Sequence, residues 1–222
     1  MKKALAYLVM LLVPLVLILT GVRLLLTHEF VYLEYHLPGF PDDPYGLTQQ
    51  QRLEYAPLAL DYLLNDQGIE FLGNQRFPDG APLYNERELS HMSDVKAVTK
   101  SFLNVWLLAL ALLVAIAAAA WRFEFWDDFR SWLGRGGRVT VFLILVLLVF
   151  TLVSFDWLFT EFHHIFFEGD SWLFLFSDTL IRLFPMRFWQ DVFIAVAAFA
   201  ILTSTALWRF APPRSAKRGK KK

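Results

Sequence analysis

Four long stretches without a charged residue alternate with polar segments along the chain. They run over Ala4–Val22, Ser101–Trp121, Val139–Phe155 and Val192–Trp208. A helix needs about 17–25 mainly apolar residues to cross the hydrocarbon core of a bilayer, so each stretch is long enough. The pattern predicts a membrane protein with four transmembrane helices.

The first stretch follows Lys2 and Lys3, as the apolar part of a secretory signal peptide also would. It is longer than the roughly 7–15 residues typical of such a peptide, and no clear small-residue cleavage site follows it. We therefore expect a retained transmembrane helix.

The segment between the first two spans carries helix-start signals. Thr48 with Gln51, and Asn85 with Glu88, have the spacing of a capping box. Helices are therefore expected to begin near residues 49 and 86. Nothing interrupts the second helix before Trp121, so it is expected to rise out of the outer segment and become the second span.

The same segment also carries strand signals. The aromatic and aliphatic run 30–35 is typical of a strand, and the runs 69–77 and 81–84 flank a Pro-Asp-Gly turn as a hairpin would. The expected fold class is a mainly α membrane protein with four transmembrane helices and a small α+β extracytoplasmic domain between helices 1 and 2.

These elements divide the chain into eight predicted segments. They are transmembrane helix 1 (1–27), an extracytoplasmic domain (28–97), transmembrane helix 2 (98–121), a cytoplasmic loop (122–138), transmembrane helix 3 (139–161), an outer interfacial loop (162–189), transmembrane helix 4 (190–210) and a basic cytoplasmic tail (211–222).

Basic residues gather on one side of the predicted membrane. With the N-terminus inside, the inner segments hold 13 of the 21 Lys and Arg residues, whereas the outer loop 160–191 holds only Arg182 and Arg187. The positive-inside rule then places both termini in the cytoplasm.

Composition removes several classes of function. The chain is 56% hydrophobic and carries 21 basic against 21 acidic residues, which indicates no nucleic-acid partner. It contains no Cys, so a thiol nucleophile, a disulfide framework and a Cys-ligated metal site are excluded.

All five histidines fall on the predicted outer side, and two of them lie at the ends of spans. His91 precedes the second span and His163 follows the third. Because imidazole exchanges a proton near neutral pH, the two could act as a general acid and a general base on a lipid. The alternative is that they only form hydrogen bonds at the membrane interface.

Two other kinds of site are weaker. A zinc site could draw on the outer histidines and carboxylates, but no HExxH or comparable motif is present. Its ligands would come from His91, Asp94, His163, His164 and Asp170. The outer serines lie in neither G-x-S-x-G nor S-x-x-K, which leaves a serine nucleophile without a motif.

His164 and Asp170 are also candidates for supporting roles, and so are four more polar residues. Asp94 could orient His91 or only stabilise the first turns of its helix. Lys96 and Arg182 could hold a lipid carbonyl, a phosphate or an oxyanion, or only extend to the interface. Asp178 lies four residues before Arg182 and could pair with it on a short helix.

Two motifs carry a resemblance to a known family. The stretch Arg87-Glu88-Leu89-Ser90-His91-Met92-Ser93-Asp94-Val95-Lys96 and the stretch Phe162-His163-His164-Ile165-Phe166-Phe167-Glu168-Gly169-Asp170-Ser171-Trp172, followed by 178–185, are the relevant sequences. With four spans, they resemble the bacterial lipoprotein intramolecular transacylases, called Lit. One departure is Gly169, where many relatives are expected to have Asn.

The resemblance implies an activity, a substrate and a location. Lit-type enzymes move the sn-2 acyl chain of a lipoprotein's diacylglyceryl-cysteine to the α-amino group of that cysteine, which gives a lyso-form lipoprotein. It also implies that His91 and His163 are catalytic, that the partners are the diacylated lipoprotein and membrane lipid, and that the site of this cell-membrane protein faces the outer leaflet.

The implied chemistry suits these residues without a cofactor or a metal. The acceptor amine has a pKa near 8 and needs a base, while the leaving alkoxide needs an acid. One histidine would take the amine proton and the other would protonate the alkoxide. The alternatives are a non-catalytic membrane interaction protein and a metal-dependent lipid hydrolase. The oligomeric state stays open.

Overall fold

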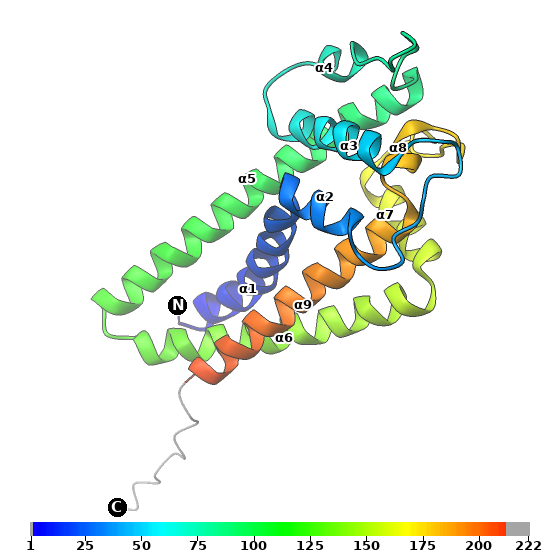
Figure 1. The fold of residues 1–222 in the computed structure, drawn as a ribbon. Coiled ribbons are helices and arrows are strands. Elements are labelled where there is room, and N and C mark those ends of the chain that lie inside the picture. Colours follow the sequence, from blue (N-terminus) through cyan, green and yellow to red (C-terminus); the bar gives the residue numbers. More distant parts are fainter. Residues whose placement is uncertain (1, 212–222) are drawn as a thin grey trace, which may run out of the picture.

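The computed structural model describes residues 2–211, and within them the chain is folded almost entirely into helices (Figure 1). The helices are α1 Lys2–Leu25, α2 His28–Tyr35, α3 Gln49–Leu64, α4 Glu70–Gly73, α5 Glu86–Arg122, α6 Trp126–Val153, α7 Phe155–Phe166, α8 Thr179–Leu183 and α9 Met186–Phe210.

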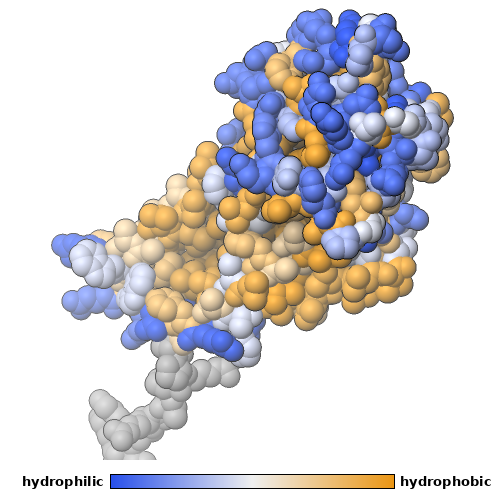
Figure 2. Space-filling model, viewed as in Figure 1, coloured by the Kyte–Doolittle hydropathy of each residue, from blue (hydrophilic) through white to orange (hydrophobic). Residues whose placement is uncertain are grey.

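Four of these helices, α1, α5, α6 and α9, are long and apolar enough to cross a membrane, as the sequence predicts. Apolar side chains cover the bundle in a broad band, and polar side chains cover the domain at one end and the helix ends at the other (Figure 2). Of the predicted basic tail 211–222, only Ala211 is among the described residues.

Close backbone packing joins three of the four long helices. α6 lies against both α1 and α9, whereas α5 packs mainly on α1 (Figure 1). A Cβ on Gly136 would lie 2.6 Å from Val13 Cβ, and one on Gly137 would lie 2.8 Å from the Ser204 carbonyl oxygen. These glycines therefore permit the contacts. They belong to α6, which begins at Trp126, well inside the predicted loop 122–138.

Both capping boxes predicted from the sequence are present. Thr48 and Gln51 cap α3, and Asn85 and Glu88 cap α5, with each side chain accepting from the other residue's backbone N–H. In α5 the apolar second span continues directly from the outer domain, so this helix fixes the position of every residue near its start relative to the membrane.

The predicted α+β character of the outer domain is wrong at the stretch 30–35. This stretch is part of α2, whose first turn is capped when the Thr27 hydroxyl accepts a hydrogen bond from the Phe30 N–H at 3.2 Å. Val31, Glu34 and Tyr35 are buried, at the three- and four-residue spacing of one helix face. Aromatic and β-branched content favoured a strand, but this periodicity and the cap favour a helix.

The predicted hairpin is also wrong. Residues 70–73 form the short helix α4, and of the hairpin only one isolated antiparallel bridge remains, between Arg76 and Pro82. The Gln75 N–H donates to the Leu72 carbonyl and the Ala81 N–H donates to the Asp79 side chain, so neither is available to extend the ladder. In residues 2–211 the outer domain is thus helical, with one β-bridge and irregular turns.

The outer domain shares its core with the loop between the last two spans. Leu180 and Leu183 of α8 are buried in the same apolar cluster as Tyr55, Leu72 and Leu83. The Tyr35 hydroxyl also donates a hydrogen bond to the Leu183 carbonyl. Segments 28–97 and 162–189 therefore form one structural unit at one end of the four spans.

Candidate active site

Two helices from distant parts of the chain bring His91 and His163 together. His91 lies on the second turn of α5, and His163 lies near the end of α7. Their ring centroids are 5.9 Å apart and the ring planes differ by 24°. Only 7% of His91 and 8% of His163 is exposed, so the pair is held away from bulk water.

The hydrogen bonds of the two rings differ. His163 Nδ1 lies 2.7 Å from the Phe159 carbonyl oxygen, one helical turn back. A carbonyl can only accept, so Nδ1 carries the proton and a neutral ring keeps its lone pair on Nε2. The Nδ1 of His91 is buried without a partner in the described part of the chain. A buried polar atom left unpaired is costly and suits a ligand.

Burial sets the protonation of His163. Desolvation lowers its pKa below the usual value, the Phe159 carbonyl partly offsets this, and the charge of neighbouring His164 lowers it further. At neutral pH the ring is therefore mainly neutral and can accept a proton.

Aromatic rings from the loop after α7 enclose the pair. Trp172 lies 4.9 Å from His163 and Phe167 lies 4.9 Å from His91, between ring centroids. Phe174 lies 5.3 Å from His91. The sequence indicated an aromatic loop that anchors in the membrane, but gave no signal for which rings cover the histidines.

Hydrogen bonds fasten this loop to the start of α5. Arg87 donates to the Leu173 carbonyl at 2.9 Å. Asn85 donates to Asp178 at 3.1 Å. Glu88 is 1% exposed and accepts from the Leu180 N–H at 2.7 Å. The sequence assigned Glu88 only a capping role, which uses one carboxylate oxygen. The other oxygen joins α5 to α8.

Lys96 and Arg182, the two predicted cations, lie in structural contacts rather than beside the pair. Lys96 Nζ donates to Asn65 Oδ1 at 3.1 Å and to a backbone carbonyl, and lies over the Tyr62 ring. Arg182 Nη2 lies 3.0 Å from Asp43 Oδ2. The predicted partner of Arg182, Asp178, instead accepts from Asn85 and from the Leu175 N–H.

Three other predicted residues are exposed. Asp94 points to solvent, His164 touches the edge of Trp172, and Asp170 lies in the turn before it. Burial therefore distinguishes His163 from its neighbour His164, which the sequence could not do. Within residues 2–211, no three His, Asp or Glu side chains are grouped closely enough to hold a metal ion.

The fold and the site define a class: a four-span membrane protein in which a helical unit at one end of the bundle encloses a pair of buried histidines. Comparisons with known proteins agree. The model of the family "Lipoprotein intramolecular transacylase Lit" matches residues 7–189. The chain therefore belongs to the Lit family.

Individual relatives extend over nearly the whole chain. An uncharacterized protein of Aquifex aeolicus is 28% identical over 208 residues, which is 90% of each chain. The in meso structure of Lit from Bacillus cereus has a TM-score of 0.77 at 16% identity, covering 94% of this chain and 93% of that one. A histidine-to-arginine variant of that protein gives 0.71, covering 95% and 92%.

Family membership confirms the activity predicted from the sequence. The chain is an acyltransferase that moves the sn-2 acyl chain of a lipoprotein's diacylglyceryl-cysteine to the α-amino group of the same cysteine.

Proposed function

We propose that the buried pair His91 and His163 carries out this acyl shift, with His163 as the proton-transfer group. The observation that supports the assignment is the hydrogen bond from His163 Nδ1 to the Phe159 carbonyl. It fixes the ring and leaves Nε2 as the free base, and the lowered pKa keeps that base unprotonated at neutral pH.

One proton moves from the amine to His163 and then to the glycerol oxygen during the acyl shift. The cysteine amine attacks the sn-2 ester carbonyl while His163 Nε2 takes a proton from the amine nitrogen. The tetrahedral intermediate then collapses, the bond from the carbonyl carbon to the glycerol oxygen breaks, and His163 returns the proton to that oxygen. The amide and the free hydroxyl are the products, and both proton steps fall to one ring rather than being divided between two.

His91 has a different role in this scheme. Its buried, unpaired Nδ1 and the near-parallel ring 5.9 Å from His163 suit a group that hydrogen-bonds the reacting ester. Such a bond is most valuable where the carbonyl oxygen becomes negative in a water-excluded site. Donor and acceptor belong to one molecule, so holding them in line contributes roughly 7–11 kcal/mol to lowering the barrier.

The substrate reaches the pair only if the aromatic cover moves. Trp172 is 8% exposed and Phe167 is 8% exposed. Exposed apolar residues of the same segment, Ile165 and Phe176, are 72% and 77% exposed and would lie among lipid chains. The diacylglyceryl group would therefore approach from the membrane and displace these rings.

The site faces the outer leaflet in this proposal, and both termini face the cytoplasm. α1 begins and α9 ends at the end of the bundle opposite the outer domain (Figure 1). Arg122, Arg130, Arg135 and Arg138 lie at that same end, as the positive-inside rule requires of the cytoplasmic side.

A matched pair of neighbouring histidines tests the assignment. His163→Gln and His164→Gln are expressed in a bacterial host that lacks the activity, and the N-terminal lipopeptide of a reporter lipoprotein is analysed by mass spectrometry. We expect a loss of about 10²–10⁴-fold for His163→Gln, the usual contribution of a positioned proton-transfer group. His164→Gln should stay near wild type. Equal lyso-form from both folded variants would refute the proposal.

A further inference from the structure

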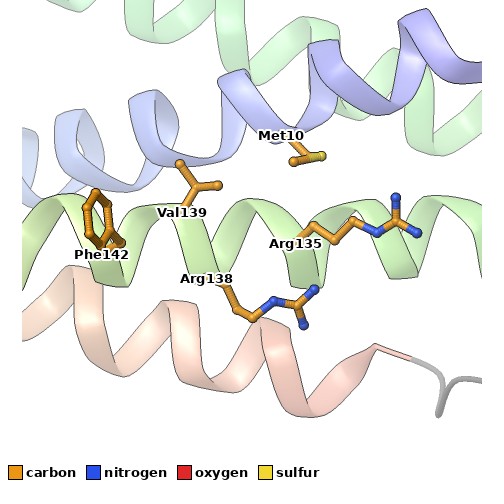
Figure 3. A pocket seen from close by; sticks show the side chains of 5 residues that line it. All are labelled: Met10, Arg135, Arg138, Val139 and Phe142. Atoms are coloured by element: carbon orange, nitrogen blue, oxygen red, sulfur yellow. The ribbon is translucent and has the colours of Figure 1, made fainter.

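A groove lies between α1 and α6 at the end of the bundle opposite the histidine pair. Met10 of α1 lines it together with Arg135, Arg138, Val139 and Phe142 of α6, and its volume is about 630 Å³. Figure 3 shows the two arginine side chains with Met10 on the facing helix and with Val139 and Phe142 farther along α6. The transacylase chemistry uses none of these residues.

The two arginines differ from Lys2 and Arg130 at the same end. Lys2 pairs with Asp128 at 2.8 Å. Arg130 donates to the Phe210 carbonyl at 2.6 and 3.0 Å. Arg135 and Arg138, by contrast, are exposed and have no hydrogen-bond acceptor or acidic partner among residues 2–211. Two free guanidinium groups one turn apart on a helix can hold the same anion.

The groove has separate polar and apolar ends. Both guanidinium groups extend toward the end where α9 stops, and Val139 and Phe142 lie on the opposite side (Figure 3). Phe142 is 66% exposed, and Leu145 and Val149 continue the same α6 face at 52% and 59%. This apolar track is longer than a headgroup and suits an acyl chain.

We propose that the groove binds a phospholipid with an anionic headgroup from the cytoplasmic leaflet, with its phosphate between Arg135 and Arg138 and an acyl chain along Phe142. Charge complementarity selects the headgroup, and the forked guanidinium groups match phosphate oxygens. The alternative to specific lipid binding is that the two arginine side chains only extend to the membrane interface without a specific partner. The site rests on the proposed orientation and is independent of the histidine chemistry.

Native mass spectrometry of the full-length protein in detergent tests this proposal. Phosphatidylglycerol is the anionic probe and phosphatidylcholine is the zwitterionic one. Arg135→Gln combined with Arg138→Gln should weaken phosphatidylglycerol binding at least tenfold. The double change of the same residues to Lys should retain most of it. Arg122→Gln is the matched control, because Arg122 is exposed at the same interface outside the groove, and it should bind as wild type.

Three results would overturn the lipid site: unchanged phosphatidylglycerol binding in the double Gln variant, equal binding of phosphatidylcholine by wild type, or displacement of the lipid by soluble glycerol phosphate. The last result would mean that the arginines bind free phosphate. Lipopeptide analysis of the double Gln variant in detergent should give wild-type transacylation, so failure of this proposal and failure of the histidine assignment are separate outcomes.

Discussion

The His91–His163 pair and the Arg182–Asp43 ion pair lie in the same structural unit. They differ in whether their buried polar atoms have hydrogen-bond partners within the protein. Asp43 has no exposed side-chain surface, and its carboxylate accepts from Arg182 and from the Leu47 N–H. His91 Nδ1 is buried with no partner among residues 2–211, and the hydrogen bond of His163 to the Phe159 carbonyl uses only its Nδ1. Both regions contain buried polar groups, but only one leaves hydrogen-bonding capacity for a substrate.

This difference separates structure from chemistry among residues that look alike in the sequence. Lys96 and Arg182 are both cations in the sequence motifs, and each is bound by acceptors of the protein itself. Substitution in the Arg182–Asp43 pair should therefore reduce stability, and substitution in the histidine pair should reduce activity.

The largest effect on stability is expected at the ion pair. Arg182→Gln leaves Asp43 as a buried carboxylate without its charge partner, and removal of one member of a buried pair typically costs about 3–5 kcal/mol. The partly exposed Arg182 places the expected value at the lower end of that range. Thermal unfolding in detergent measures it, and the Asp43→Asn, Arg182→Gln double variant should recover part of the loss. Equal stability of the single variant and wild type would contradict the comparison.

Acid should weaken the same pair. Burial alone would raise the pKa of Asp43, but the hydrogen bond from Arg182 and the Leu47 N–H outweigh it and lower the pKa below its usual value. A group with a depressed folded pKa contributes stability above its unfolded value of about 3.9 and loses it as the pH falls through the folded pKa. The pair should thus be intact at neutral pH and should weaken only in acid.

A smaller effect on activity is expected from the aromatic cover. Trp172→Ala removes the ring 4.9 Å from His163 and lets water reach it. Since burial is the main cause that lowers the pKa of His163, this change should raise that pKa toward its ordinary value. The acid limb of the kcat/KM profile should move to higher pH, so the loss of activity should be larger below neutral pH than at neutral pH. Phe176→Ala, which removes an exposed ring of the same loop, should leave the limb in place.

The smallest effect is expected at Asp94. The sequence made it a candidate to orient His91, but the side chain is exposed and makes no hydrogen bond to that ring in the described structure. Asp94→Asn should change transacylation by less than about twofold, because surface substitutions away from buried networks have small effects. A loss as large as that of His163→Gln would show that Asp94 acts on the site.

Local signals in the sequence were sufficient for some features and not for others. The apolar runs located the four spans, and the side-chain spacing of Thr48 and Asn85 located two helix starts, because length and capping act over a few residues. The stretch 30–35 was misread because residue type favoured a strand, while burial of Val31, Glu34 and Tyr35 on one face depends on the tertiary fold.

The same limit applies to the site. The motifs indicated His91 and His163, but the pairing of Arg182 with Asp43 joins residues 139 positions apart, and the second hydrogen bond of Glu88 joins residues 92 positions apart. Short-range spacing offered Asp178 as the partner of Arg182. No local pattern could show that the loop 38–46 supplies the carboxylate that pairs with Arg182.

The central claim is that His91 and His163 act as one unit on one substrate, and a double-mutant cycle tests it most directly. The kcat/KM for lyso-form production is measured for His91→Gln, His163→Gln and the double variant, each checked for folding. When two residues act as a unit, removing both lowers kcat/KM little further than the more damaging single substitution does. The kcat/KM of the double variant should therefore lie within a few fold of that of the less active single variant. Losses that multiply across the two positions would contradict the claim and make the two histidines independent.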